Sequence, residues 1–595
     1  MDFAHLHVAS AYSLRHGATM PADLVARAAE HGQSMLALTD RDGVYGAVRF
    51  VQACSAAGIT PILGVDLALD LPHVRSSRTR DSNVGGAGRP MPPVARPPDA
   101  GVPSGIPQRG RVHRTPLRGG AWVDPRHPRA VLLARGPRGW RSLCRLLTAV
   151  HATRDDARSA AASLDQIAAH ADGLVVLLGP HSPVVEALAV HRPDLADTLV
   201  APWREIFGEA LRIEVVSHRA RSGPLSTAVA ARALGWARDR GITPVLAHAV
   251  RYVDPGQGRV VDVLDATRRL VALDDRHRDR PNAQGFLAPA SFMADIADEI
   301  AQAAGAGRRT SRDLLAAAVD LAGECALTPA DLGIGEVVVP ELDVVVGESD
   351  AARADPILRA RCESGLDRYR GAERIAARHR LEEELRTIAT LGFATYFLTV
   401  AEVVDLTRGL GIRVAARGSG AGSLVNHLLG ISGIDPMRHG LLMERFLTPL
   451  RRQLPDIDID VESARRLEVY DAIIDRFGTE RVATVSMMET YRVRHAIRDV
   501  GAALALPPGE IDTLAKAFPH VRARDVRNAL RDLPELRDSG LGRMTARGEL
   551  DHFWQLVEGL DGLPRHVACT PAACCLPTPP CSIAPPSSPA ARAIP

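Results

Sequence analysis

The chain has 595 residues, more than one hydrophobic core ordinarily accommodates, so about two to four domains are expected. Its 46% hydrophobic content indicates a largely globular protein, and a formal net charge of +2 is too small to predict a polyanionic partner from charge alone. There is no apolar run of about 18 residues and no signal-peptide pattern in "MDFAHLHVAS", so a cytoplasmic protein with no membrane partner is predicted.

The first part of the chain alternates short apolar strands with helical stretches. "SMLALTD" (34–40) and "ITPILGVDLAL" (59–69) predict strands, and "PADLVARAAEHG" (21–32) predicts a helix with proline near its start and glycine at its end. The pattern resumes at "AVLLARG" (130–136) and reaches "ITPVLAHAVRYV" (242–253). Such alternation is typical of an α/β core with parallel strands.

Composition changes mark the other segments. Residues 73–126 are rich in Pro, Gly and Arg and predict a disordered insertion. Ala-rich helical sequence runs to about Cys325, a mixed segment reaches residue 489, and residues 490–567 read as helical throughout. Residues 568–595 hold four of the eight cysteines among Pro, Ala and Ser, without a metal-ligand spacing, and predict a disordered tail.

An acidic stretch, "DIDID", begins at Asp456. On a strand, Asp456, Asp458 and Asp460 share one face and the two isoleucines share the other. Neighbouring carboxylates on one face can approach a pair of divalent ions, and oxygen-only ligands suit Mg²⁺ or Mn²⁺ rather than zinc. A solvated edge strand is an equally good interpretation of these residues alone.

A glycine- and serine-rich loop lies about 40 residues upstream in "IRVAARGSGAGSLVNHLLG" (412–430). Glycines let backbone N–H groups approach phosphate closely, a helix N-terminus favours an anion, and Arg417 supplies positive charge. The loop has neither the lysine of a Walker A motif nor the spacing of a dinucleotide fingerprint. By itself it predicts a turn, but together with the acidic strand it outlines a triphosphate cradle beside a metal site.

These motifs, in their order along the chain, resemble the bacterial C-family DNA polymerases, the polymerase III alpha subunits, and particularly their error-prone branch. The resemblance rests on "LEEELRTIATLGFATYFLTVAEVV" (381–404), "ARGSGAGSLV" (416–425), "IDPMRHGLLMERFLTPLRRQLPDIDID" (434–460) and "TYRVRHAIRDVGAALALP" (490–507). It implies that Asp458 and Asp460 are catalytic metal ligands for two Mg²⁺ ions, with Asp456 in support. It also implies a nucleotide-binding set of Arg417, Gly418, Ser419, Gly420, Gly422, Ser423 and Arg494.

The N-terminal part resembles the PHP (polymerase and histidinol phosphatase) domain, a metal phosphoesterase with a barrel-like α/β fold. His5, His7 and Asp40 match its ligand motifs, and Asp66 replaces the usual glutamate. Arginines stand where the family has metal-binding histidines, and a guanidinium repels cations. We therefore expect a degenerate site with a structural role.

The resemblance implies an α/β multidomain fold. A PHP-type distorted β/α barrel (1–270) is followed by a helical connector and an incomplete nucleotidyltransferase-type mixed α/β palm (271–489). A helical thumb-like region (490–567) and the tail (568–595) complete the expected order.

The implied function is error-prone, DNA-directed DNA synthesis linked to DNA damage and repair. The substrates would be a dNTP and primer–template DNA, and a sliding clamp and other damage-response polymerase factors would be partners. After Ala568 the sequence departs from the family, where a third catalytic aspartate, the fingers and the clamp-binding region would follow, so we expect this chain to be inactive. A non-catalytic nucleotide- or nucleic-acid-binding remnant and a PHP-type phosphoesterase are the alternatives.

Overall fold

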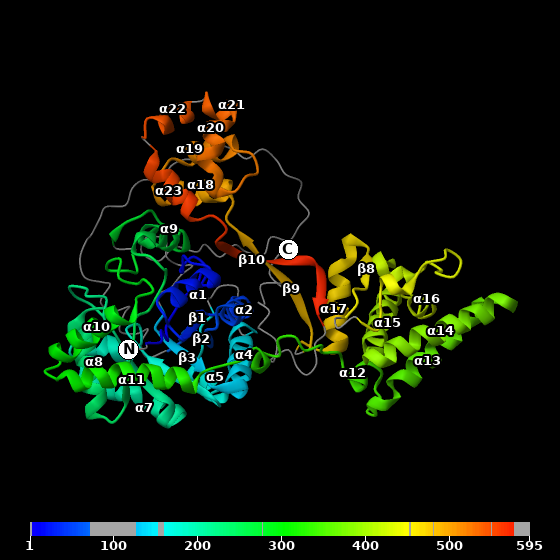
Figure 1. Ribbon diagram of the computed structural model, residues 1–595, viewed down its shortest axis with the longest axis horizontal. Helices are drawn as coiled ribbons and strands as arrows, with labels where there is room; N and C mark the ends of the chain where they lie inside the picture. Colours follow the sequence, from blue (N-terminus) through cyan, green and yellow to red (C-terminus); the bar gives the residue numbers. More distant parts are fainter. Residues whose placement is uncertain are drawn as a thin grey trace, which may run out of the picture. The chain divides into compact units, whose positions relative to one another are not determined.

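A computed structural model (Figure 1) describes residues 3–71, 127–152, 160–275, 278–450, 454–479, 481–538, 540–548 and 550–575. The predicted insertion at 73–126 and the tail beyond residue 575 lie outside the described residues. The chain forms two compact units, one of Met1–Thr328 with Met488–His566 and the other of Pro329–Met487 with Val567–Pro595.

The first unit contains a mixed six-stranded sheet in which the strands follow one another in chain order. They are β1 (Met35–Arg41), β2 (Thr60–Ala68), β3 (Arg129–Ala134), β4 (Leu174–Leu178), β5 (Leu211–Val216) and β6 (Thr243–Ala247). Only β3 runs antiparallel to its neighbours. The segment at the N-terminus joins the two edges of the sheet, because His5 bridges Leu36 of β1 and Val8 bridges Val250 just after β6. This closure confirms the predicted distorted barrel.

Helices follow most of the strands and bury their apolar faces against the sheet. They are α1 (Pro21–Glu30), α2 (Ala47–Ala57), α4 (Gly136–Ala152), α5 (Leu164–Ala169), α6 (Pro183–Ala189), α7 (Pro193–Phe207), α8 (Thr227–Asp239), α9 (Gly258–Arg269), α10 (Ala290–Ala303) and α11 (Arg308–Glu324). The predicted strands and helices of this region are confirmed, and α10 and α11 extend the unit beyond the expected boundary at residue 270.

The helices of the predicted thumb-like region belong to the same unit. They are α18 (Val493–Ala503), α19 (Pro508–Ala517), α20 (Val526–Asp532), α21 (Pro534–Arg537), α22 (Gly540–Ala546) and α23 (Asp551–Gly559). Val261 and Leu264 of α9 share one buried cluster with Ile497 of α18 and Trp554 of α23. This apolar face packs the helices against α9 within one compact unit.

The second unit is mostly helical. It contains α12 (Leu342–Val346), α13 (Ala354–Gly365), α14 (Gly371–Leu391), α15 (Ala394–Gly409), α16 (Leu424–Leu428), α17 (Arg466–Phe477), and the antiparallel pair β7 (Val414–Arg417) and β8 (Asp458–Val461). In the described residues no single helix is long and apolar enough to cross a membrane. The pair of α14 and α15, bent by 112° between them, reaches that length and apolar composition only when the two are taken together.

A further two-stranded sheet pairs β9 (Ala483–Thr490) with β10 (Pro564–Cys575). The predicted disordered tail begins at residue 568, but β10 continues to Cys575. Backbone pairing with β9 supplies hydrogen bonds that the composition of this segment did not suggest.

Candidate active site

The acidic stretch forms a strand with the predicted alternation. β8 pairs with β7 so that Asp458 lies opposite Arg417 and Asp460 opposite Ala415. The aspartates are exposed, whereas Ile459 is half-buried and packs against the apolar cluster around Ala416. The strand therefore turns a carboxylate face to solvent because its other face is anchored in the core.

Arg417 links the acidic strand to the glycine loop. Its Nε donates a hydrogen bond of 2.9 Å to Oδ1 of Asp460, and the two side chains are 63% and 65% exposed. Gly418 follows with a φ of 72°, and a Cβ at this position would lie 3.2 Å from Oδ2 of Asp458. Glycine suits this position because of its positive φ, and the carboxylate of Asp458 comes close to it. The structure brings Arg417, Gly418, Asp458 and Asp460 together, as the sequence predicted.

The loop continues as a short 3₁₀ segment, Gly418–Gly422, and has two dissimilar halves. Arg417, Gly418 and Ser419 are exposed, whereas Gly420 and Gly422 are buried. A Cβ on Gly422 would lie 2.7 Å from the backbone oxygen of Leu442, so packing explains this glycine without any ligand. Only the outer half of the loop is open to a bound phosphate.

The inner end of the loop is occupied by a carboxylate of the protein itself. The Ser423 hydroxyl donates to Oε2 of Glu384 at 2.9 Å, and the backbone N–H groups of Leu424 and Val425 donate to the same carboxylate at 2.9 and 3.0 Å. Both Ser423 and Glu384 are buried. The expectation that Ser423 and the helix N-terminus bind phosphate stays a prediction, and in this structure Glu384 accepts the hydrogen bonds of these donors.

Sequence reasoning missed Glu384, although its position carried a signal. Ala377, Leu381, Leu385 and Ile388 form the buried stripe of α14, and Glu384 lies within that stripe at helical spacing. A charged residue at a buried position of an amphipathic helix must have partners inside the protein. That requirement singles out Glu384 from the neighbouring acids of "LEEEL".

Tyr396 on α15 is hydrogen-bonded to the segment that leads into the acidic strand. Its hydroxyl donates a hydrogen bond of 2.6 Å to the backbone oxygen of Pro455, which directly precedes Asp456. The tyrosine lies in the "GFATYFL" segment that carried the family resemblance. It has a structural partner here that the sequence alone did not indicate.

Arg494 belongs to the other unit. It lies on α18, is half-buried, and its Nε donates to the backbone oxygen of Phe518 at 2.9 Å. Its predicted place beside the nucleotide stays a prediction.

The residues predicted to form the PHP-like site are hydrogen-bonded within the fold, and His5, Asp40 and Asp66 are buried while His7 is half-buried. Burial lowers the pKa of His5 to about 4, and its Nε2 lies 2.8 Å from the backbone oxygen of Ala288. His7 Nδ1 lies 2.8 Å from Oε1 of Glu214, a buried carboxylate on β5. Burial opposes charge on His7, but Glu214 raises its pKa above the usual value. Glu214 was missed, although it is an acid within an apolar strand, where a partner is required.

The two aspartates of that site have ordinary internal partners. Asp40 accepts hydrogen bonds from Ser10 and Ser13, and burial raises its pKa to about 6. Burial also opposes ionisation of Asp66, but Arg129 and Arg41, at 2.9 and 3.2 Å, together hold its pKa well below the usual range. Arginine side chains thus supply the positive charge at Asp66.

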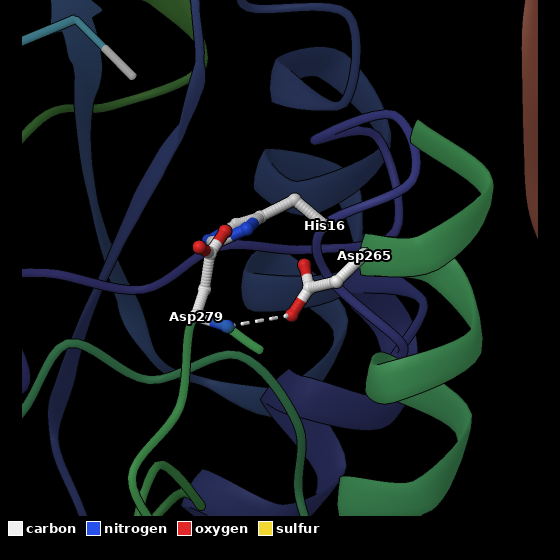
Figure 2. A group of neighbouring side chains, drawn as sticks. All are labelled: His16, Asp265 and Asp279. Carbon is white, nitrogen blue, oxygen red and sulfur yellow. Dashed lines mark hydrogen bonds between the residues drawn. The ribbon is translucent and has the colours of Figure 1, made fainter. Parts of the chain in front are cut away.

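Another cluster in this unit has the composition of a metal site. Figure 2 shows His16, Asp265 and Asp279 converging, and ligand atoms of the three lie within 4.8 Å of one another. The carboxylate of Asp265 is paired with Arg251 at 2.7 Å and Arg268 at 3.0 Å, and Arg268 also pairs with Asp279. Because guanidinium groups already neutralise both carboxylates, the cluster lacks the negative charge that a divalent cation needs, and we assign no metal to it.

Comparison with known families gives two matches that follow one another along the chain. The PHP domain matches residues 5–218, and the bacterial DNA polymerase III alpha NTPase domain matches residues 356–586.

The relatives include proteins named "Error-prone DNA polymerase". That of Nocardia farcinica is 32% identical over 586 residues, covering 95% of this chain and 46% of the relative. That of Symbiobacterium thermophilum is 32% identical over 560 residues (91% and 44%), and that of Mycobacterium tuberculosis 31% identical over 533 residues (87% and 42%). The chain spans a little under half the length of these relatives. A solved amidohydrolase from Chromobacterium violaceum, 14% identical, covers 41% of this chain and 86% of its own with a TM-score of 0.24, which is too low to indicate a function.

Proposed function

Because this chain belongs to the C family of bacterial DNA polymerases, within its error-prone branch, we propose that β8 and the outer half of the glycine loop bind the triphosphate of a dNTP for DNA-directed DNA synthesis. The observation that carries this proposal is the adjacency of Arg417 and Gly418 to the exposed Asp458 and Asp460. Carboxylates, a guanidinium and an open glycine backbone are the groups that a metal-bound triphosphate requires.

The residues present fit a pair of divalent cations. Asp458 and Asp460 offer exposed oxygen donors on one face of a strand, and such donors prefer Mg²⁺ or Mn²⁺. When bound there, the cations would neutralise charge on the phosphoryl group as it is attacked by the primer 3′-hydroxyl. The protein's own contribution is to hold the triphosphate through Arg417 and the N–H groups near Gly418 and Ser419. We propose Mg²⁺ as the physiological ion.

The partners proposed for the reaction are primer–template DNA and the dNTP, in damage-associated synthesis of low fidelity. This substrate class and the branch are supported by the names of the relatives and by the family match. The sliding clamp and other damage-response factors stay predictions from the family resemblance.

Nucleotide binding without turnover is a second candidate. In the described part of the chain β8 pairs only with β7, and no third strand adds a carboxylate to this sheet. A two-metal polymerase site that lacks one carboxylate would retain affinity for a metal–triphosphate complex but lose transition-state stabilisation. A PHP-type phosphoesterase is less well supported, because Arg41 and Arg129 neutralise Asp66.

Isothermal titration of the full chain with dATP and excess Mg²⁺ tests the proposal. Wild-type protein is expected to bind, and Asp458→Asn and Asp460→Asn are each expected to weaken binding by about tenfold or more, because each removes a charged oxygen ligand. Asp456→Asn, a change of an exposed aspartate two residues before β8, is expected to weaken it less. Binding that is unaffected by both Asp458→Asn and Asp460→Asn would contradict the assigned site.

Primer extension with the same proteins separates the two candidates. Extension by wild-type protein that is abolished in Asp458→Ala establishes catalysis. Binding of Mg·dATP without extension establishes the non-catalytic candidate.

A further inference from the structure

The buried carboxylate of Glu384 is the least expected group near the proposed nucleotide site. It is 1% exposed and lies on the apolar face of α14, between Leu381 and Ile388. A carboxyl group at such a position destabilises the fold unless it is fully hydrogen-bonded within the protein. Glu384 meets that requirement entirely with groups from the glycine loop and from its own helix.

Four donors surround the carboxylate. Oε1 accepts from Leu424 N at 2.9 Å and from Arg380 Nε at 3.0 Å, and Oε2 accepts from the Ser423 hydroxyl at 2.9 Å and Val425 N at 3.0 Å. Three of the four come from the segment that ends the glycine loop and begins α16. The carboxylate thus takes the place that an anionic ligand has at many helix N-termini.

Arg380 extends the same attachment to the middle of the loop. It lies one turn before Glu384 on α14, and its guanidinium donates a hydrogen bond of 2.6 Å to the backbone oxygen of Gly422. Asn426 adds an internal contact, because its Nδ2 donates to the oxygen of Gly420 at 2.9 Å. The inner half of the loop is therefore held on both its N–H and its carbonyl sides.

The outer half of the glycine loop is not held by Glu384 or Arg380 and lies exposed beside the acidic strand. Arg417 contacts Asp460, and Gly418 approaches Asp458, six and five residues before Ser423, the first residue that donates to Glu384. A loop this short moves at its outer end when its inner end is released, because few backbone torsions separate the two.

From this arrangement we infer that Glu384 is a positioning residue. It fills the N-terminus of α16 with an internal anion, and so directs a bound triphosphate to Arg417, Gly418 and Ser419 beside the carboxylates of β8. The inference rests on the proposed function. It adds that phosphate does not bind at the buried serine end of the loop, and that affinity for nucleotide depends on a residue that does not touch it.

The experiment compares Glu384→Gln with wild-type full-length chain. Mn²⁺ binding alone, followed by the EPR signal of free Mn²⁺, reports on Asp458 and Asp460. Titration with Mg·dATP reports on the carboxylates and the loop together. Glu384→Gln keeps the volume of the side chain but places an amide N–H₂ against N–H donors. Glu382→Gln is the matched control, because it lies on the same helix, is 42% exposed and pairs instead with Arg359.

Glu384→Gln is expected to weaken Mg·dATP binding about tenfold while Mn²⁺ affinity stays within about twofold. Glu382→Gln is expected to change neither. Ser423→Ala, which removes one hydrogen bond but leaves the carboxylate and the other donors, is expected to weaken Mg·dATP binding by only about two- to threefold. Hydrogen exchange of Glu384→Gln should quicken at residues 418–425 and stay unchanged elsewhere.

Each other result has a distinct meaning. If wild-type protein binds Mg·dATP and Glu384→Gln binds it equally well, the positioning role is refuted and the proposed function stands. If Glu384→Gln also loses Mn²⁺ binding and exchanges rapidly throughout the second unit, its role is only in the fold, and the inference is again refuted. If wild-type protein binds Mn²⁺ but no Mg·dATP, the proposed function itself fails and the inference fails with it.

Discussion

Replacing Arg417 with glutamine should have opposite effects on the binding of metal and on the binding of nucleotide. The Arg417 guanidinium lies 2.9 Å from Oδ1 of Asp460, one of the two proposed metal ligands. A cation that binds Asp460 must displace this arginine or accept its repulsion. A triphosphate, in contrast, gains a charge-assisted hydrogen bond from the released guanidinium. Arg417→Gln removes the competitor of the metal and the partner of the phosphate in a single change.

The exposure of the Arg417–Asp460 ion pair sets the size of the expected change in Mn²⁺ affinity. Two unit charges about 3 Å apart attract by about 1.4 kcal/mol in water, and exposed pairs measure about 0.2–1 kcal/mol. Since both side chains are more than three-fifths exposed, we expect Arg417→Gln to tighten Mn²⁺ binding by about three- to fivefold. Loss of a charge-assisted hydrogen bond, about 1.5–3 kcal/mol, should weaken Mg·dATP binding by at least about tenfold.

The assay is the pair of titrations by Mn²⁺ EPR and calorimetry, at low salt and at about 0.5 M salt, where the Mn²⁺ effect should shrink through screening. Arg413→Gln is the matched control. Arg413 immediately precedes β7, its side chain is 89% exposed, and it pairs loosely with Glu462 at 3.7 Å. That variant removes the same charge without touching Asp460. Mn²⁺ binding that is unchanged or weaker in Arg417→Gln would refute the competition argument.

Three further outcomes follow from contacts within the two units. Burial lowers the pKa of His218 to about 4. Below about pH 6.5 the unfolded chain therefore gains a proton that the folded chain does not. The free energy of unfolding should fall by up to about 3 kcal/mol as the pH drops from about 6.5 towards 4. Urea unfolding across that range should show less pH dependence in His218→Gln, and equal pH dependence would contradict the lowered pKa of His218. Gly422→Ala should destabilise the protein by about 1–3 kcal/mol, because the added Cβ would lie 2.7 Å from the backbone oxygen of Leu442. Gly433→Ala, whose Cβ meets open space, should leave the stability unchanged. Equal melting temperatures of the two variants would refute the packing argument. Tyr396→Phe loses the 2.6 Å hydrogen bond that precedes the acidic strand and should cost about 1 kcal/mol in urea unfolding, with no change expected if that bond is absent in solution.

The sequence predicts well the features that depend on local periodicity. Asp458 and Asp460 alternate with isoleucines, so a strand with one acidic face is predicted without knowledge of its neighbours. The strand that leads into Gly418 is equally apparent, and the family resemblance connects the two segments. Their pairing as β7 and β8 then brings the loop to the carboxylates.

Features that depend on distant partners were not predictable in this way. Helical spacing marks Glu384 rather than Glu382 as the buried acid of "LEEEL", but no local pattern identifies its partners Ser423, Leu424 and Val425. The packing of Ile497 and Trp554 on α9 joins residues more than 200 positions apart, for which no local pattern exists. The hydrogen bond of Ser423 to Glu384 was not predicted for the same reason, because the two residues are 39 positions apart in the chain.

Burial distinguishes two of the arginine–aspartate arrangements of this chain. Asp66, with Arg41 and Arg129, is enclosed in the barrel with little access to water. A cation there would have to expel guanidinium groups from partners that no solvent replaces, which costs several kcal/mol. The pair of Arg417 and Asp460 is open to water on both sides and contributes about 1 kcal/mol or less. Separating arginine from aspartate is therefore costly at the first site, whereas the small cost at the second is compatible with the proposed binding of a metal ion and a triphosphate there.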